Sequence, residues 1–305
     1  MPRKILYFIL LILMSLLGAY CYNSFSESKA MVRFSQTEPI PSYQWNQRGE
    51  PLKIAMISVL NRQETYRYQR QVAQAIGEKM GRPVLLLQRR SYAEINQLLV
   101  KGGADIALLS TGAYSIYSKK EDFVLLVMQE RHGKPYYESY VVVPKQSTVN
   151  SLWELAGKSF AYTDPLSYSG YLAVRQVINS NGMDANVFFA NSYFTYSHDK
   201  SLRAVSGNFV DGATVDSLAY DYLKVKQPQL IAGIRIVAVL PSAGTGPIVA
   251  RSDFPDKDKV QEILLHLHED PGIAQALNEL MIDRFIRPQP ELYPSFESLP
   301  PDGGQ

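Results

Sequence analysis

The stretch Asp164-Pro165-Leu166-Ser167-Tyr168-Ser169-Gly170-Tyr171 lies between two patterns that decide the fold around it. The apolar run 159–162 before it is typical of a buried strand, and apolar residues recur at helical spacing from 170 to 181 after it. A strand, a turn rich in hydroxyl groups and a helix start suit an anion, because the first N–H groups of a helix lack internal partners and its dipole favours negative charge. The same residue types are common helix caps, so an ordinary capped helix is the alternative.

Short apolar runs alternate with helical patterns along most of the chain. We expect strands at 53–59, 84–88, 105–110, 123–129, 137–143, 159–162, 186–190, 211–215 and 234–240. We expect helices at 64–80, 92–101, 113–118, 151–156, 170–181, 199–206, 216–223, 257–268 and 272–284. This alternation predicts an α/β fold with two sets of parallel strands covered by helices, joined by two extended connections into a hinged clamshell.

The predicted domains follow from where the pattern changes. Lobe 1 comprises 52–143 together with 244–285, and lobe 2 comprises 144–243. Residues 23–51 are polar and lack a sustained period, which predicts a linker, and 286–305 form a proline-rich tail.

The N-terminal 22 residues resemble an export segment rather than part of the fold. Arg3 and Lys4 precede an apolar run that ends near Tyr20, the pattern of a signal peptide or of a short membrane anchor. Cys21 stands where a lipoprotein signal places its acylated residue, but a small residue usually precedes that cysteine, and here it is Tyr20. The sequence does not decide between cleavage, lipidation at Cys21 and retention as an anchor. In all three cases the rest of the chain is exported. We therefore expect a periplasmic or extracytoplasmic protein that its N-terminal segment can attach to the membrane.

Composition excludes several kinds of partner and cofactor. The net charge is +2, which does not favour nucleic acid. Cys21 is the only cysteine, so the exported part forms no internal disulfide and no thiolate metal site. His266 and His268 lie two residues apart, a spacing that does not place them on one face of a helix. We expect neither a metal nor another cofactor.

Polar residues follow several of the predicted strands. They are 111–114, 164–170, 197–199 and 216–217. The carboxyl ends of strands in open α/β sheets border the ligand crevice, so these segments are the candidate site. Thr111 is a candidate on this ground.

Four passages together resemble the PhnD-type family of phosphate-, phosphite- and phosphonate-binding periplasmic proteins of ABC importers. They are Gly102-Gly-Ala-Asp-Ile-Ala107, Asp164–Tyr171, Ser197-His-Asp199 with Ala204-Val205 and Gly207, and Val210-Asp-Gly-Ala-Thr-Val-Asp-Ser217. The resemblance covers roughly 52–281 and implies the two-lobed type II periplasmic binding protein fold.

The resemblance also implies which residues hold the anion. They are Tyr114, Ser167 with Ser169, His198 and Asp216. The chain departs from the family pattern at Ser110-Thr111, where Gly-Pro is usual, and at Tyr168, where a small Thr or Ser is usual. Tyr168 is therefore a candidate whose ring either narrows the site or turns away from it.

These candidates include no Lys or Arg, so Asp216 would repel a full dianion. The set suits an oxyanion that retains a proton, or a ligand with an amine, to which Asp216 acts as acceptor. The charge of His198 could tune affinity with pH. The structural alternatives are helix caps for Asp216 and His198 and a core ring for Tyr114.

The predicted function is that of an exported solute-binding protein, not an enzyme. It captures a small oxyanion, such as a phosphonate, phosphite or phosphate, in an interlobe cleft for an ABC-type importer, with the permease as partner. One alternative is a sensing clamshell that reports to a membrane signalling protein. A hydrolase is the weakest alternative, because no serine has the surroundings of an activated nucleophile.

Overall fold

The computed structural model describes residues 49–57, 62–117 and 119–296. The chain divides into two units, Met1–Asn46 and Gln47–Gln305, and all described residues belong to the second. The predicted export segment with Cys21, nearly all of the predicted linker and the end of the tail lie outside the described residues. No helix in the described part combines the length and the apolar character needed to cross a membrane.

The first of two sheets contains six strands among the described residues, in the order β11-β4-β10-β3-β1-β2. They are β1 (Leu52–Met56), β2 (Val84–Gln88), β3 (Ile106–Leu108), β4 (Phe123–Glu130), β10 (Ile248–Arg251) and β11 (Arg284–Ile286). Strand β1 pairs in parallel with β2 and β3, whereas β10, β4 and β11 pair antiparallel, so the sheet is mixed rather than wholly parallel.

Helices cover both faces of this sheet. They are α2 (Arg62–Met80), α3 (Tyr92–Val100), α4 (Thr111–Ile116), α9 (Lys257–Leu265) and α10 (Ala274–Glu279), with short 3-10 turns η2 (Lys120–Asp122), η5 (Leu267–Glu269) and η6 (Pro290–Leu292). Successive residues of β1 point to opposite faces, so Ile54 packs with α2, α9 and α10 and Ala55 packs with α3 and α4. Both faces of β1 are buried, which is why the strand is apolar along most of its length.

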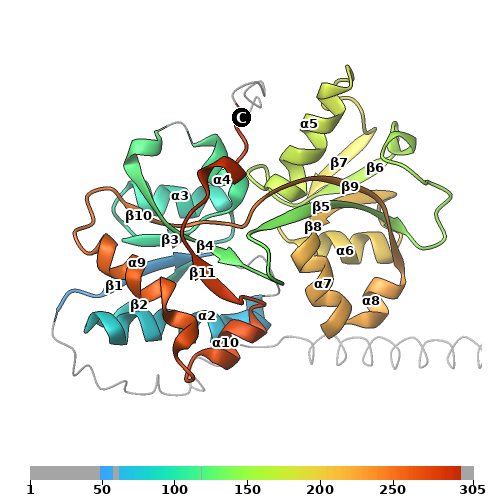
Figure 1. Ribbon diagram of the computed structural model, residues 1–305. Helices are drawn as coiled ribbons and strands as arrows, with labels where there is room; N and C mark the ends of the chain where they lie inside the picture. Colours follow the sequence, from blue (N-terminus) through green and yellow to red (C-terminus); the bar gives the residue numbers. More distant parts are fainter. Residues whose placement is uncertain (1–48, 58–61, 118, 297–305) are drawn as a thin grey trace, which may run out of the picture. The chain divides into compact units, whose positions relative to one another are not determined.

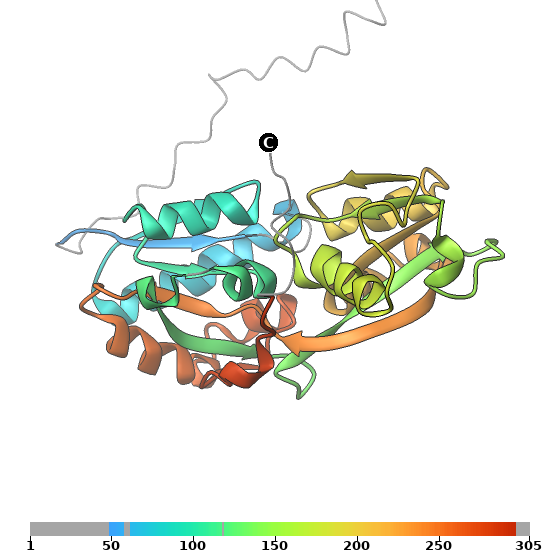
Figure 2. The same cartoon turned by 90° about the horizontal axis from the view of Figure 1, so that it is seen from above.

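The second sheet, again counted over the described residues, has five strands in the order β7-β6-β8-β5-β9. They are β5 (Tyr136–Pro144), β6 (Ser159–Tyr162), β7 (Asn191–Phe194), β8 (Gly212–Asp216) and β9 (Ile234–Gly244). Around it lie η3 (Trp153–Leu155), the π-helical turn η4 (Tyr168–Leu172), α5 (Ala173–Ser180), α6 (His198–Ser206), α7 (Ser217–Lys226) and α8 (Pro228–Ala232). Figures 1 and 2 show the two sheets with their helices as two groups of elements.

The chain passes between the sheets at 131–135, before β5, and at 245–247, after β9. The two passages are joined by Thr245, whose N–H donates to the carbonyl oxygen of Pro135 at 2.9 Å. Its Oγ1 also donates to the carbonyl oxygen of Gln129 in β4 at 2.6 Å. The division into two lobes remains a prediction. By strand pairing, β5 lies in the second sheet, although the predicted boundary placed residues up to 143 in lobe 1.

Among the predicted elements that differ from the observed ones are one strand and one helix. The predicted strand 186–190 is wrong, because Phe188 and Phe189 are buried in a turn, where the Phe189 ring stacks on Phe160 at 4.0 Å, and the strand is β7 just after them. The predicted helix 272–284 ends at Glu279, and its last residue begins β11. In the first case an apolar run serves ring packing rather than sheet pairing.

Candidate functional site

A cavity of about 60 Å³ is lined by residues from both sheets. Its walls are Tyr92, Leu108, Leu109, Ser110, Thr111, Gln129, Arg131, Tyr137, Ser167, Ser169, His198, Asp216, Leu218, Ala219, Thr245 and Gly246. Because one water needs roughly 10–15 Å³ of such space, the cavity has room for about four waters, or for one small ion. Five predicted site residues line this cavity, namely Thr111, Ser167, Ser169, His198 and Asp216.

The serine-rich stretch forms η4, a π-helical turn that leads into α5. Ser167 caps it, and its Oγ accepts the N–H of Gly170 at 3.0 Å. A side chain at Gly170 would place its Cβ 2.4 Å from Thr163, so only glycine fits there. Turns of this kind are frequent at functional sites. The helix cap and the candidate anion-binding turn predicted from the sequence therefore fall on the same segment, η4.

The turn is fixed to the second sheet through its backbone. The carbonyl oxygen of Ser169 accepts from Ser139 Oγ at 2.7 Å and from Thr214 Oγ1 at 2.6 Å. The side chains of Ser169 and Thr111 lie close to the Tyr137 hydroxyl, and burial raises the pKa of Tyr137 well above its ordinary value. Tyr137 therefore stays neutral and brings another hydroxyl to the cavity. It was not predicted, because it stands at the start of a predicted strand rather than after one.

His198 has a defined protonation state. Its Nδ1 accepts the backbone N–H of Asp216 at 3.0 Å and contacts Thr163 Oγ1 at 3.2 Å. Burial lowers the pKa of His198 to about 3, so the ring is neutral at pH 7. With Nδ1 as acceptor, the proton resides on Nε2, which makes that nitrogen a hydrogen-bond donor. The proposed tuning of affinity through the charge of His198 does not fit this geometry.

Asp216 is both a helix cap and a cavity residue. Its Oδ1 accepts from the N–H of Leu218 at 2.7 Å and of Ala219 at 3.3 Å at the start of α7. Burial raises its pKa to about 6, against the lowering effect of the two N–H groups and of Arg131. The carboxyl group is therefore close to taking up a proton near neutral pH.

Arg131 brings to the cavity the cation that the predicted site lacked. Its guanidinium donates to Gln129 Oε1 at 3.0 Å and to the carbonyl oxygens of Leu280 at 2.5 Å and Met281 at 3.3 Å. Burial lowers its pKa to about 10, which leaves it charged at pH 7. No described carboxylate lies within ion-pair distance of it, and Asp216 and Asp283 act on it only from farther away. A signal was present in the sequence, since Arg131 comes two residues after the run predicted as strand 123–129.

The remaining two predicted residues lie elsewhere. The hydroxyl of Tyr168 donates to the carbonyl oxygen of Pro241 at 2.8 Å, and its ring packs with Tyr137 and Phe296. The ring has thus turned away from the cavity. Tyr114 lies on the far end of α4, where its ring meets Tyr293 at 5.1 Å. It lines a separate surface pocket and is partly buried against the core of the first sheet.

Comparison with known proteins agrees with this architecture. The signature of the family described as "ABC transporter, phosphonate, periplasmic substrate-binding protein" matches residues 54–293. The chain belongs to this family. Its members are substrate-binding proteins of transport systems and not enzymes, so the predicted class of protein is confirmed.

Individual relatives have low sequence identity to this chain but match it over most of its length. The phosphonates-binding periplasmic protein of Escherichia coli is 25% identical over 242 residues, which cover 77% of this chain and 71% of that protein. A binding protein component of an ABC phosphonate transporter from Pseudomonas aeruginosa superposes with a TM-score of 0.71 at 22% identity, covering 78% of this chain and 81% of that one. PhnD1 from Prochlorococcus marinus, solved in complex with methylphosphonate, gives 0.70 at 17% identity, covering 79% and 94%. The predicted type II binding protein fold is confirmed.

Proposed function

We propose that the cavity holds one phosphorus oxyanion, a phosphonate, phosphite or phosphate, and that the protein delivers it to an ABC permease. The observation that carries the proposal is the charged Arg131 in the cavity wall without a carboxylate partner among the described residues. A partly buried charge is costly unless an opposite charge approaches it, and an anion in the cavity would supply that charge. Neutral donors on Tyr137 and on His198 Nε2 then complete a set of hydrogen bonds to oxygen atoms.

Asp216 restricts which anion fits. An ionised carboxylate would repel a dianion, whereas a carboxyl group with a pKa of about 6 can share a proton with the ligand. Phosphorus oxyacids carry such a proton near neutral pH, and sulfate does not. The bound methylphosphonate of the Prochlorococcus relative supports the same chemical class.

We also propose that the protein acts outside the cytoplasmic membrane. It is released if residues 1–22 are cleaved off, and it stays attached to the membrane if Cys21 is lipidated or the segment is retained. Membership in a family of importer components favours a permease as partner over a signalling protein. The binding energy would come from several hydrogen bonds that converge on the ligand. Closure of the two lobes on the ligand would signal to the permease that the site is occupied.

Calorimetry on the protein with phosphate, phosphite, methylphosphonate and sulfate tests the proposal. We expect at least one phosphorus oxyanion to bind and sulfate to be excluded. Arg131→Met should weaken binding by at least about tenfold, since hydrogen bonds to charged groups contribute roughly 1.5–3 kcal/mol. Arg131→Lys keeps the charge and should lose less, and Arg203→Met, which removes an exposed arginine, is the matched control.

Two results would contradict the proposal. The first is that none of the phosphorus oxyanions binds to protein whose thermal unfolding shows it to be folded. The second is that Arg131→Met and Arg203→Met bind as well as the unaltered protein, because Arg131 would then not face the ligand.

A further inference from the structure

A pocket of about 480 Å³ lies outside the candidate site, between the end of α4 and the last described segment of the chain. One side of its wall comes from α4 and η2, and the other comes from η6 and the residues that follow it. Figure 1 shows this last segment, drawn in red, beside α4. Small-molecule sites typically have volumes of roughly 300–1,000 Å³, so the pocket has room for a ligand much larger than the ion proposed for the candidate site.

The last segment is fixed by contacts with the rest of the protein. The Tyr293 ring meets the Tyr114 ring edge-on at 5.1 Å, and its hydroxyl donates to the carbonyl oxygen of Thr245 at 2.9 Å. Phe296 is buried in the core of the second sheet, where its ring packs with Tyr168. The pocket is therefore preformed, so that a ligand does not have to order its walls.

The walls offer flat apolar surface. Four rings among the described residues line the pocket, those of Tyr114, Tyr117, Tyr293 and Phe296, together with two prolines. The hydroxyls of Tyr293 and Tyr117 already bind protein atoms, the latter donating to Asp122 at 2.6 Å. Such walls favour an aromatic ligand, because stacked and edge-to-face rings gain more than the area they bury.

Lys120 brings a positive charge to the wall. Its ammonium lies 4.0 Å from the centre of the Tyr114 ring and donates to the Tyr114 carbonyl oxygen at the end of α4. Burial lowers the pKa of Lys120 to about 8, so it is mostly charged at pH 7. No Asp or Glu lies among the described residues of the pocket wall. Because an ammonium has three N–H donors, two remain for a ligand.

Ser115 brings a second donor. Its hydroxyl oxygen is buried and has no hydrogen-bond partner within the part of the chain that the structure describes. Leaving a buried hydroxyl without a partner costs free energy, which a ligand that binds it recovers. The two oxygens of a carboxylate accept hydrogen bonds from an ammonium and a hydroxyl, so this is the group that the two donors fit.

We propose that this pocket is a second ligand site, which binds a small aromatic carboxylate. The rings of the ligand lie against the aromatic side chains of the wall, and its carboxylate accepts from Lys120 and Ser115. An apolar cavity of about 150 Å³ accepts benzene, so a pocket of about 480 Å³ takes two fused rings and a carboxylate. The site shares no residue with the cavity of the candidate site, and the inference does not depend on the proposed function.

NMR titration of the protein with naphthoate tests the inference. Naphthamide and naphthylmethylammonium, which have the same rings, are the neutral and the cationic comparators. We expect naphthoate to bind with a Kd of about 1 mM or lower, the usual affinity for a ligand of this size. Naphthamide should bind at least about fivefold more weakly, because it lacks the charge that strengthens both hydrogen bonds. Naphthylmethylammonium should bind more weakly still, because Lys120 repels it.

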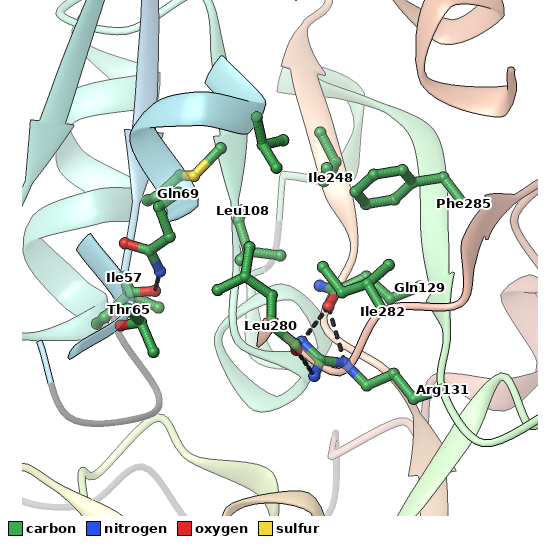
Figure 3. Close-up of a pocket in the computed structure, with 12 residues that line it drawn as sticks. Ile57, Thr65, Gln69, Leu108, Gln129, Arg131, Ile248, Leu280, Ile282 and Phe285 are labelled. Atoms are coloured by element: carbon green, nitrogen blue, oxygen red, sulfur yellow. Dashed lines mark hydrogen bonds between the residues drawn. The ribbon is translucent and has the colours of Figure 1, made fainter. Parts of the chain in front are cut away.

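Two variants remove the two donors separately. Lys120→Met should weaken naphthoate binding by about tenfold, since hydrogen bonds to charged groups are strong, and Lys101→Met, which changes an exposed lysine at the end of α3, is the matched control. Ser115→Ala should weaken it severalfold without lowering the free energy of unfolding, because the lost hydroxyl has no partner in the protein. Arg131→Met should leave naphthoate binding unchanged, since Arg131 lies in the candidate site, where it donates to Gln129 (Figure 3).

Four results would overturn the inference. Naphthoate would show no saturable binding at concentrations well above about 1 mM. Naphthamide would bind as tightly as naphthoate. The affinity for naphthoate would be unchanged in both Lys120→Met and Ser115→Ala. Binding would be lost in Arg131→Met, because the probe would then occupy the candidate site. If Lys120→Met does not fold, because the lysine caps α4, Ser115→Ala decides alone.

Discussion

Asp216 is the residue at which protonation and ligand binding are coupled. Burial raises its pKa from 3.8 to about 6, so between these pH values the folded protein holds a proton that the unfolded chain has released. The stability it contributes is full below about pH 4 and is lost as pH rises through 6, by roughly 3 kcal/mol at most. An anion in the cavity also prefers the protonated form. We therefore expect affinity for methylphosphonate to decrease as pH rises past about 6.

Calorimetry between pH 5 and 8 on the unaltered protein and on Asp216→Asn measures this coupling. The ligand's own titration affects both proteins equally, so the difference between the two profiles belongs to Asp216. We expect the asparagine variant to have the flatter profile. Identical profiles would show that Asp216 acts only as the cap of α7.

At the scale of the element, η4 is held by its capping bonds and by the buried Tyr168 ring, which packs with Tyr137 and Phe296. Tyr168→Phe removes the hydrogen bond to the carbonyl oxygen of Pro241, and we expect a loss of about 1 kcal/mol in the free energy of unfolding. Ligand affinity should not change, because the ring does not line the cavity. Tyr168→Ser, the residue type that the family favours, also leaves a void and should cost about 3–5 kcal/mol, as large-to-small aromatic changes do.

Denaturant unfolding and calorimetry on the same variants check both halves of this prediction. Tyr220→Phe changes a ring of α7 that packs on Tyr140 outside the cavity, and it serves as the control for losing a hydroxyl. If Tyr168→Phe weakened ligand binding by tenfold while stability was retained, the hydroxyl would have a role in the site that its position does not suggest.

For the described molecule as a whole, the segments around the cavity are joined by direct contacts between the two groups of elements. Asp164 Oδ2 accepts the N–H of Tyr92 at 3.3 Å, and Ser110 Oγ donates to the carbonyl oxygen of Leu166 at 3.1 Å. Gly112 lies so close to the η4 segment that an added Cβ would be 2.4 Å from that same oxygen. These contacts depend on a close approach of the two groups.

Gly112→Ala should therefore disfavour the close approach without unfolding either group. We expect weaker ligand binding by about tenfold or more and a smaller decrease of the radius of gyration when ligand is added, measured by X-ray scattering. Gly272→Ala, whose Cβ would meet only Asp270 at 3.2 Å, is the control. Normal affinity and normal compaction in Gly112→Ala would mean that this contact has no part in binding.

The sequence by itself determined the α/β class, most strand positions and the segments that line the candidate site. Periodicity reveals which faces are buried, and polar residues after strands reveal where those strands end; both are local properties of the chain. The serine turn was recognisable because capping and anion binding require the same short-range residue types.

Only the tertiary structure decided which of these side chains meet. Arg131 reaches the cavity because it directly follows the end of β4, where the chain passes to the second sheet. The carbonyl oxygens of Leu280 and Met281 accept hydrogen bonds from its guanidinium and hold it there. Tyr168 turns away from the cavity because a carbonyl oxygen of β9 accepts its hydroxyl. Burial keeps His198 neutral, and the backbone N–H of Asp216 fixes its tautomer. Each of these depends on a partner distant in the sequence, and local pattern carries no information about such partners.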